Sequence, residues 1–149
     1  MTRMGLHEYF MDIAYSVASR STCLHRKIGA ILVIDKHIIS TGYNGVPRNI
    51  NHCSETGCIK DKNSLHSGEG NDLCRAVHAE SNAICMAAYH GIPIKDSILY
   101  CTNKPCFSCS KLIINSGIKK VIYDHDYPDD RSLMLFKQAK IDFISMTEL

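Results

Sequence analysis

Short apolar segments alternate with helical segments through the second half of the chain, and this alternation limits the fold more strongly than any other feature. Strand–helix–strand units of this kind form parallel β-sheets whose faces are covered by helices. The second half therefore predicts an α/β fold. In chain order, we expect a helix over 79–89, a strand over 98–102, a helix over 105–116, a strand over 120–123, a helix over 131–140 and a strand over 141–144.

The first half adds one helix and two strands to this pattern. Apolar side chains recur at helical spacing over 6–20. Residues 28–34 form a continuous apolar run, which is typical of a strand buried on both faces. The pair Asp35-Lys36 predicts a tight turn, from which residues 37–41 return as a second strand.

Residues 45–77 interrupt the periodic pattern. They hold four of the nine glycines and three of the eight cysteines, and no apolar period runs through them. A segment of this length without a core of its own is functional, cross-linked or disordered. Because 149 residues suit one compact domain, we expect a single domain over 1–149. We also expect a cysteine-bearing insertion at about 45–77 that its cysteines hold in place.

Charge and hydropathy exclude several classes of protein. The net charge of +2 is far below the basic excess of a dedicated nucleic-acid binder. No apolar run reaches the roughly 18 residues of a transmembrane helix, and the first residues lack the apolar stretch of a signal peptide. We therefore expect a cytoplasmic protein. In that reducing compartment, the eight cysteines are expected to bind metals or take part in catalysis rather than form disulfides.

Three residues have the spacing of a metal site. Cys106 and Cys109 are three residues apart at a predicted helix start, so both sulfurs lie on one face of its first turn. A helix N-terminus favours the thiolate form that binds zinc. His78 begins another predicted helix and adds an imidazole nitrogen. Two thiolates and one imidazole predict a zinc site whose fourth position stays open to water, as in catalytic zinc sites.

Glu80 lies two residues after His78 and is not needed to complete the metal site. Zinc lowers the pKa of a bound water to about 7, and a carboxylate nearby can move its proton to a substrate nitrogen and a leaving amine. A Cys-x-x-Cys pair alone also fits a redox pair or half of a structural zinc site, but these interpretations leave His78 and Glu80 without a role. The combination of H-x-E with P-C-x-x-C matches the signature of zinc nucleobase deaminases, here attacking C4 of cytosine.

Several short motifs outside the zinc residues carry a family resemblance. They are Ser21-Thr22-Cys23, Ile28-Gly29-Ala30, Gly42-Tyr43-Asn44-Gly45, Pro47, His52-Cys53, Gly57-Cys58, Cys74-Arg75 and the stretch 78–84. With them, the whole chain resembles the cytidine and deoxycytidylate deaminases. The resemblance implies a three-layer α-β-α fold with a mixed five-stranded sheet, usually assembled as a hexamer. It also implies hydrolysis of dCMP to dUMP and ammonia for thymidylate synthesis, activation by dCTP with Mg²⁺, and inhibition by dTTP.

The resemblance also points to substrate contacts. In relatives the asparagine of the Gly-Tyr-Asn-Gly turn reaches the sugar, which implies this role for Asn44. Its flanking glycines let a ligand approach the backbone, and a plain turn asparagine is the alternative. Arg26 and Lys27 are candidates for the 5′-phosphate, which needs a cation or free backbone N–H groups. Tyr127 is either a pocket residue or a solvated loop tyrosine, and Ala79 completes the expected contacts.

The remaining cysteines suggest a second metal site. Two of them are separated by four residues within 45–77, an acceptable spacing for zinc ligands. A four-thiolate structural zinc would hold this segment beside the active site. In some relatives the second zinc site mixes cysteine with histidine or glutamate ligands. By this resemblance, His52 or His66 is an alternative to one of the four thiols. The other interpretation is that these cysteines are free thiols. The four expected ligands are Cys23, Cys53, Cys58 and Cys74.

Three other functions are compatible with the same zinc motifs. A tRNA adenosine deaminase shares them, but such relatives usually carry glutamate before Pro-Cys and lack the insertion, whereas this chain has Lys104 and residues 45–77. The modest charge also disfavours a polynucleotide substrate. A cytosine nucleoside or dCTP deaminase uses the same chemistry with a different pocket. A non-catalytic, zinc-stabilised nucleotide-binding module keeps the metal but has no use for Glu80.

Overall fold

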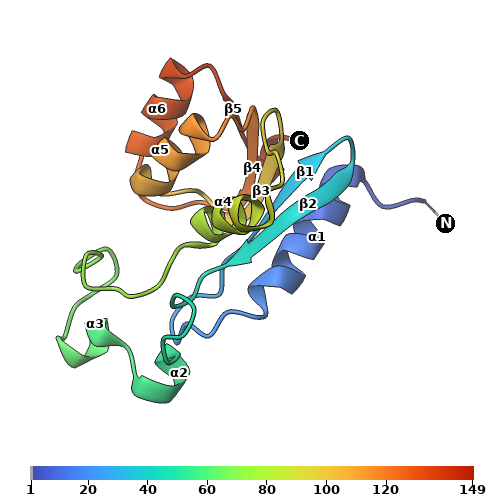
Figure 1. Cartoon of the computed structure of the whole chain (residues 1–149). Helices are drawn as coiled ribbons and strands as arrows, with labels where there is room; N and C mark the ends of the chain where they lie inside the picture. Colours follow the sequence, from blue (N-terminus) through green and yellow to red (C-terminus); the bar gives the residue numbers. More distant parts are fainter. Residues whose placement is uncertain (1) are drawn as a thin grey trace.

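Five strands form one mixed sheet at the centre of the molecule, in the order β2-β1-β3-β4-β5 (Figure 1). The computed structural model describes residues 2–149. β1 runs antiparallel to both β2 and β3, whereas β3, β4 and β5 are parallel to one another. This arrangement confirms the expected mixed five-stranded sheet and its parallel second half. The strands are β1 (Gly29–Ile34), β2 (His37–Tyr43), β3 (Ile98–Asn103), β4 (Lys120–His125) and β5 (Asp142–Ser145).

Helices cover both faces of the sheet, which confirms the three-layer fold (Figure 1). Helix α1 packs on one face, and α4, α5 and α6 lie on the other. Helices α5 and α6 connect parallel strands, and they share a face because both strand–helix–strand connections are right-handed. Within residues 2–149, no helix combines the length and the apolar character needed to cross a bilayer. The helices are α1 (Leu6–Ala18), α4 (Ala79–His90), α5 (Phe107–Asn115), α6 (Arg131–Gln138) and the terminal 3₁₀ helix η1 (Met146–Glu148).

Strand β1 is buried on both faces, as its continuous apolar run predicts. Its side chains alternate between the two layers of helices. Ile31 packs with Phe10 and Ala14 of α1, whereas Ala30 and Leu32 pack with the layer formed by α4 and α5. The predicted elements are all present, and their ends lie within about two residues of the expected positions.

Helix α4 approaches β2 closely at Gly42. A Cβ atom on Gly42 would lie 2.3 Å from both the carbonyl oxygen of Ala79 and the amide nitrogen of Ala83. Ser40 reinforces the contact, because its hydroxyl donates a hydrogen bond of 2.6 Å to the carbonyl oxygen of Ala83. This packing sets the position of the N-terminus of α4 and therefore of His78, the residue that caps it.

Residues 46–76 project from the sheet and are closed at their base by backbone hydrogen bonds (Figure 1). Gly45 and Val77 form an antiparallel bridge with N···O distances of 3.1 and 2.8 Å. Two short helices lie in the segment, α2 (Cys53–Thr56) and α3 (Ile59–Lys62). Side chains tie it to residues 22–26 through the pairs Thr22–His52 (3.2 Å), His25–Asp61 (2.8 Å) and Arg26–Ser67 (3.1 Å).

We expect the substitution Gly42→Ala to lower the free energy of unfolding by about 1–3 kcal/mol, because the added methyl group must displace the backbone of α4. Gly45→Ala is the matched control, since a Cβ at that position meets no atom nearer than 3.7 Å. Urea unfolding followed by circular dichroism measures both variants. Equal stabilities would show that α4 shifts without cost and would refute this account of its placement.

Candidate active site

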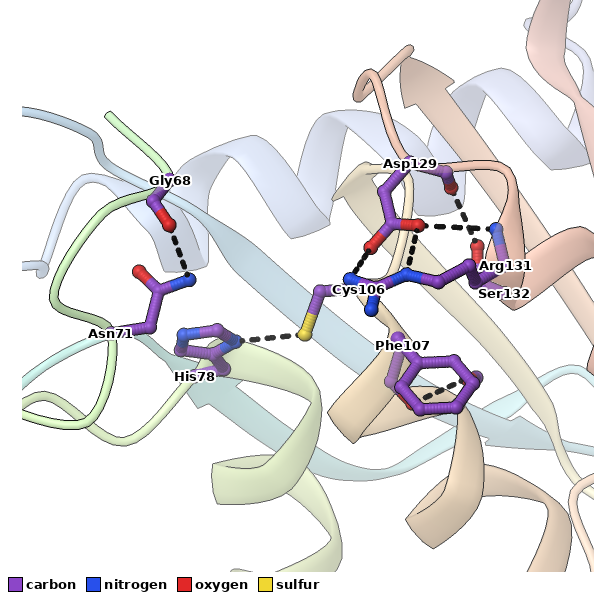
Figure 2. A network of polar contacts seen from close by, with 9 residues as sticks. Gly68, Asn71, His78, Cys106, Phe107, Asp129, Arg131 and Ser132 are labelled. Atoms are coloured by element: carbon purple, nitrogen blue, oxygen red, sulfur yellow. Dashed lines mark hydrogen bonds and ion pairs between the residues drawn. The ribbon is translucent and has the colours of Figure 1, made fainter. Parts of the chain in front are cut away.

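Two helix N-termini meet beside the central strands and bring together the three residues expected to bind a metal. His78 caps α4, Cys106 caps α5, and Cys109 is buried in the first turn of α5. The imidazole Nδ1 of His78 lies 3.4 Å from the Sγ atom of each cysteine. In Figure 2 the side chains of His78 and Cys106 point toward each other. The ligand atoms of all three residues lie within 4.8 Å of one another.

This donor set fits zinc. Two sulfurs and one imidazole nitrogen are ligands that zinc prefers, and three protein ligands are typical of catalytic rather than structural zinc sites. Within residues 2–149, no fourth histidine, cysteine or carboxylate ligand atom joins the group. The group therefore has the composition that leaves one tetrahedral position for water or substrate.

The two thiols differ in acidity without a metal. The hydrogen bond from Cys109 lowers the pKa of the Cys106 thiol, and His78 lowers it further. The same hydrogen bond, together with burial, raises the pKa of Cys109. The hydrogen bond to Cys106 in turn raises the pKa of His78. Metal binding therefore has to displace protons from this group, as it does wherever a metal takes thiolate ligands.

Glu80 is buried next to these residues, with 4% of its surface exposed. Burial raises the pKa of its carboxyl group to about 7, and the nearby His78 opposes part of this rise. A carboxyl group with this pKa can both accept and release a proton near neutral pH. Glu80 therefore has the position and the acidity of a group that transfers protons.

A cleft of about 1100 Å³ opens over the metal-binding group and includes Glu80. Three stretches of chain form its walls: the segment around Arg26, the insertion around His66, and the loop that carries Tyr127. The cleft is large enough for a small molecule such as a nucleotide. The metal-binding group therefore lies inside a binding site rather than at a structural position in the core.

Asn44 and Arg26 line this cleft, as expected, whereas Lys27 is exposed and is not among the lining residues. The side-chain oxygen of Asn44 accepts a hydrogen bond of 2.8 Å from the backbone of Ile28. Its amide group donates one of 2.8 Å to the carbonyl oxygen of Arg26. Asn44 thus fastens the end of β2 to the start of β1, and one amide hydrogen is left for a ligand.

Tyr127 and Ala79, the other expected contacts, lie in different surroundings. Tyr127 lines the cleft, and its ring centroid lies 5.8 Å from the guanidinium carbon of Arg26. Ala79 is fully buried in the core, so only its backbone could face a ligand. The roles of Asn44, Arg26, Lys27, Tyr127 and Ala79 in binding a substrate stay predictions.

The four cysteines expected to bind a second zinc do not form one group. Among residues 2–149, the ligand atoms of His25, Cys58 and Asp61 lie within 4.8 Å of one another, and Cys23, Cys53 and Cys74 do not join them. His52 contacts Thr22, and His66 bonds through its backbone to Glu69. None of the eight cysteines forms a disulfide, and the second zinc stays a prediction.

The sequence analysis missed several cleft residues that lie near Cys106. Arg131 pairs with Asp129 through two contacts of 2.8 Å and lies over the ring of Phe107, with 4.9 Å from its guanidinium carbon to the ring centroid. Figure 2 shows this pair and Phe107 on the side of Cys106 away from His78. Lys104 also lines the cleft. No spacing rule marks these residues as part of the cleft, because that depends on how the start of α6 packs beside the start of α5.

Comparison with known proteins agrees with this geometry. The family profile described as "Cytidine and deoxycytidylate deaminase zinc-binding region" matches residues 4–125. A deoxycytidylate deaminase of Schizosaccharomyces pombe is 39% identical over 137 residues, which cover 92% of this chain and 42% of that protein. A deoxycytidylate deaminase of Mycobacterium phage D29 is 38% identical over 128 residues, covering 83% of this chain and 97% of that protein.

A solved structure has a closely similar fold. The dCMP deaminase of cyanophage S-TIM5, crystallised in complex with dCMP and dUMP, aligns with a TM-score of 0.81 and 29% identity. The alignment covers 98% of this chain and all of that one. Against the longer fungal relative, by contrast, the chain spans less than half of the length.

The three-layer fold and the His-Cys-Cys group at two helix N-termini define a zinc-binding α/β protein. The match over residues 4–125 makes the assignment more specific. The chain belongs to the cytidine and deoxycytidylate deaminase family, as its motifs predict.

We expect Cys109→Ser to remove one zinc equivalent per chain, because an alcohol at this position replaces a thiolate ligand. Cys85→Ser is the matched control, since Cys85 is an exposed cysteine on α4 outside both groups of ligand atoms. Elemental analysis of the purified variants measures the metal content. Full zinc content in the Cys109→Ser variant would contradict the assignment of this ligand.

Proposed function

We propose that the chain catalyses the hydrolysis of dCMP to dUMP and ammonia. The observation that carries this proposal is the group formed by His78, Cys106 and Cys109 within 4.8 Å, in the same cleft as the buried Glu80. Relatives named deoxycytidylate deaminase and the cyanophage enzyme with bound dCMP and dUMP support the choice of substrate. Residues 1–149 would then act as one deaminase domain, with 45–77 contributing a wall of the cleft.

Different side chains of the cleft would bind the metal and transfer the protons in this reaction. His78, Cys106 and Cys109 would hold zinc, which when bound acts as a Lewis acid and makes water a nucleophile near neutral pH. Glu80 would transfer both protons of the attacking water in turn: the first to N3 of the cytosine ring, and the second, released by the new hydroxyl group at C4, to the amine that leaves. Water supplies the new oxygen at C4, and the amine departs as ammonia.

Other residues would hold the substrate. The Asn44 amide hydrogen left free by the backbone is available to the sugar, and the Arg26 guanidinium is available to the phosphate. Tyr127 lies against Arg26 and can limit the sideways movement of the nucleotide. The proposal therefore places base, sugar and phosphate along one cleft, with the base at the metal-binding group.

We expect Glu80→Gln to lower kcat for ammonia release from dCMP by at least about 100-fold, because glutamine cannot transfer protons. Zinc content and the unfolding midpoint should stay close to those of the wild type, since glutamine has nearly the same volume. Ammonia is measured for dCMP, CMP, deoxycytidine and dCTP, and dCMP should give the highest kcat/KM. A wild-type chain that holds zinc but releases no ammonia from any of the four would instead be a nucleotide-binding module.

We also propose a second zinc site in the segment 45–77, with Cys58 as one ligand. Cys58 belongs both to the set expected from sequence and to the group that contains His25 and Asp61. Two zinc equivalents per wild-type chain are therefore expected, of which Cys58→Ser removes one. A single equivalent in the wild type, unchanged by Cys58→Ser, would leave only the catalytic metal.

Three further points concern the cellular location, the regulation and the assembly of the protein. We propose that the protein works in the cytoplasm, where its eight free cysteines stay reduced. Activation by dCTP with Mg²⁺, inhibition by dTTP and assembly into a hexamer stay predictions from the family resemblance. Ammonia release with and without these nucleotides, and light scattering after gel filtration, test them. Filter binding to tRNA should be negative, because a net charge of +2 gives weak attraction to a polynucleotide.

A further inference from the structure

Four aspartates lie within residues 124–130, the end of β4 and the loop after it, and one of them, Asp129, lines the cleft. Each of them has a partner on another part of the chain or at the start of α6. Tyr15 donates to Asp124, Lys104 contacts both Asp126 and Asp130 at 3.1 Å, and Arg131 contacts Asp129 at 2.8 Å. The acidic loop, residues 124–130, is thus held by one tyrosine and two cations.

Lys104 is the buried member of this network. Only 5% of its side chain is exposed, compared with 79% for Asp126 and 87% for Asp130. Its backbone N–H donates a hydrogen bond of 2.8 Å to the carbonyl oxygen of His125 at the base of the loop. A buried ammonium group is costly unless it is paired. The side chain of Lys104 therefore lies beneath the loop, and its ammonium group contacts two exposed carboxylates.

The acidic loop lies where a nucleotide would bind. Tyr127, Asp129 and Arg131 line the cleft, as does Lys104 itself. Tyr127 also contacts Arg26, the residue expected to bind the phosphate. Asp126 and Asp130 do not line the cleft themselves, but they belong to the loop that does, and without Lys104 both would lose the cation that they contact. The loop would then be more negative, and like charges repel a phosphate dianion.

We propose that Lys104 is a positioning and specificity residue, whose ammonium offsets the charge of the acidic loop and so admits a nucleotide carrying a 5′-phosphate. The inference rests on the proposed function, because it concerns the substrate of that same cleft. Lys104 acts on the phosphate through the field of the loop and has no part in the chemistry at C4.

A purely architectural role for the ion pair makes a different prediction. Lys104→Met and Asp126→Asn each remove the ion pair that these residues form at 3.1 Å. If the contact only shapes the loop, both changes weaken dCMP binding. If the charge matters, they act in opposite directions, because the first leaves the loop more negative and the second leaves it less negative. Asparagine also keeps an oxygen to accept the hydrogen bond that Asp126 receives from the backbone of Tyr127.

The experiment compares KM and kcat for dCMP and deoxycytidine in zinc-loaded wild type and four variants. We expect Lys104→Met to raise KM for dCMP about fivefold and Asp126→Asn to lower it about threefold, with small changes in kcat. Neither variant should change kcat/KM for deoxycytidine more than about twofold, because the nucleoside has no phosphate, and raised salt should reduce the differences for dCMP. Lys104→Arg keeps the charge and should resemble the wild type. Lys120→Met is the matched control, since it removes a lysine–aspartate pair of 3.7 Å between β4 and β5.

The results separate this inference from the proposed function. A KM for dCMP that is not lowered in Asp126→Asn, or equal losses for dCMP and deoxycytidine in Lys104→Met, would overturn the role of Lys104. If the wild type releases no ammonia, the proposed function fails. Calorimetric Kd values for dCMP in the same variants then replace KM, and opposite shifts in Lys104→Met and Asp126→Asn still support the inference. An absence of dCMP binding in all variants would overturn both.

Discussion

The close packing of α4 on the sheet is the constraint on which the candidate active site depends. Gly42 allows the backbone of α4 to approach β2 to a distance that no side chain would permit, and Ser40 bonds to the same turn of the helix. The N-terminus of α4 thereby stands beside that of α5, which the parallel strands β3 and β4 place independently. His78 meets Cys106 and Cys109 because both placements hold at once.

Pairs of opposite charges surround the place where the N-termini of α4 and α5 meet. In the metal-binding group the pKa of Cys106 is lowered and that of Cys109 is raised. A bound divalent cation would ionise both thiols, and their two negative charges would balance it. Near Cys106, Lys104 and Arg131 hold three carboxylates of the acidic loop. These two cations offset half of the charge of the loop's four aspartates, which reduces the repulsion of an incoming anion.

The insertion contributes a wall of the cleft without a core of its own. It is closed at its base by the bridge between Gly45 and Val77 and is tied to residues 22–26 by polar side chains. Contacts of this kind between exposed groups contribute little stability individually. A second metal at Cys58 would therefore be the strongest restraint on the segment, and its absence would leave the wall weakly held.

The sequence by itself determined the order of helices and strands, the two-sided burial of β1 and the residues of the metal-binding group. These features depend on local periodicity and on spacings of a few residues, which are properties of the chain alone. Only the tertiary structure decided that Cys58 lies with His25 and Asp61 instead of the other three thiols, and that Lys104 lies beneath the acidic loop. The contact of His78 with the two cysteines also joins distant residues, but it was predictable because both partners belong to short recognisable motifs. The contacts of Cys58 and Lys104 follow from how loops pack on the sheet, and no motif in the sequence marks them.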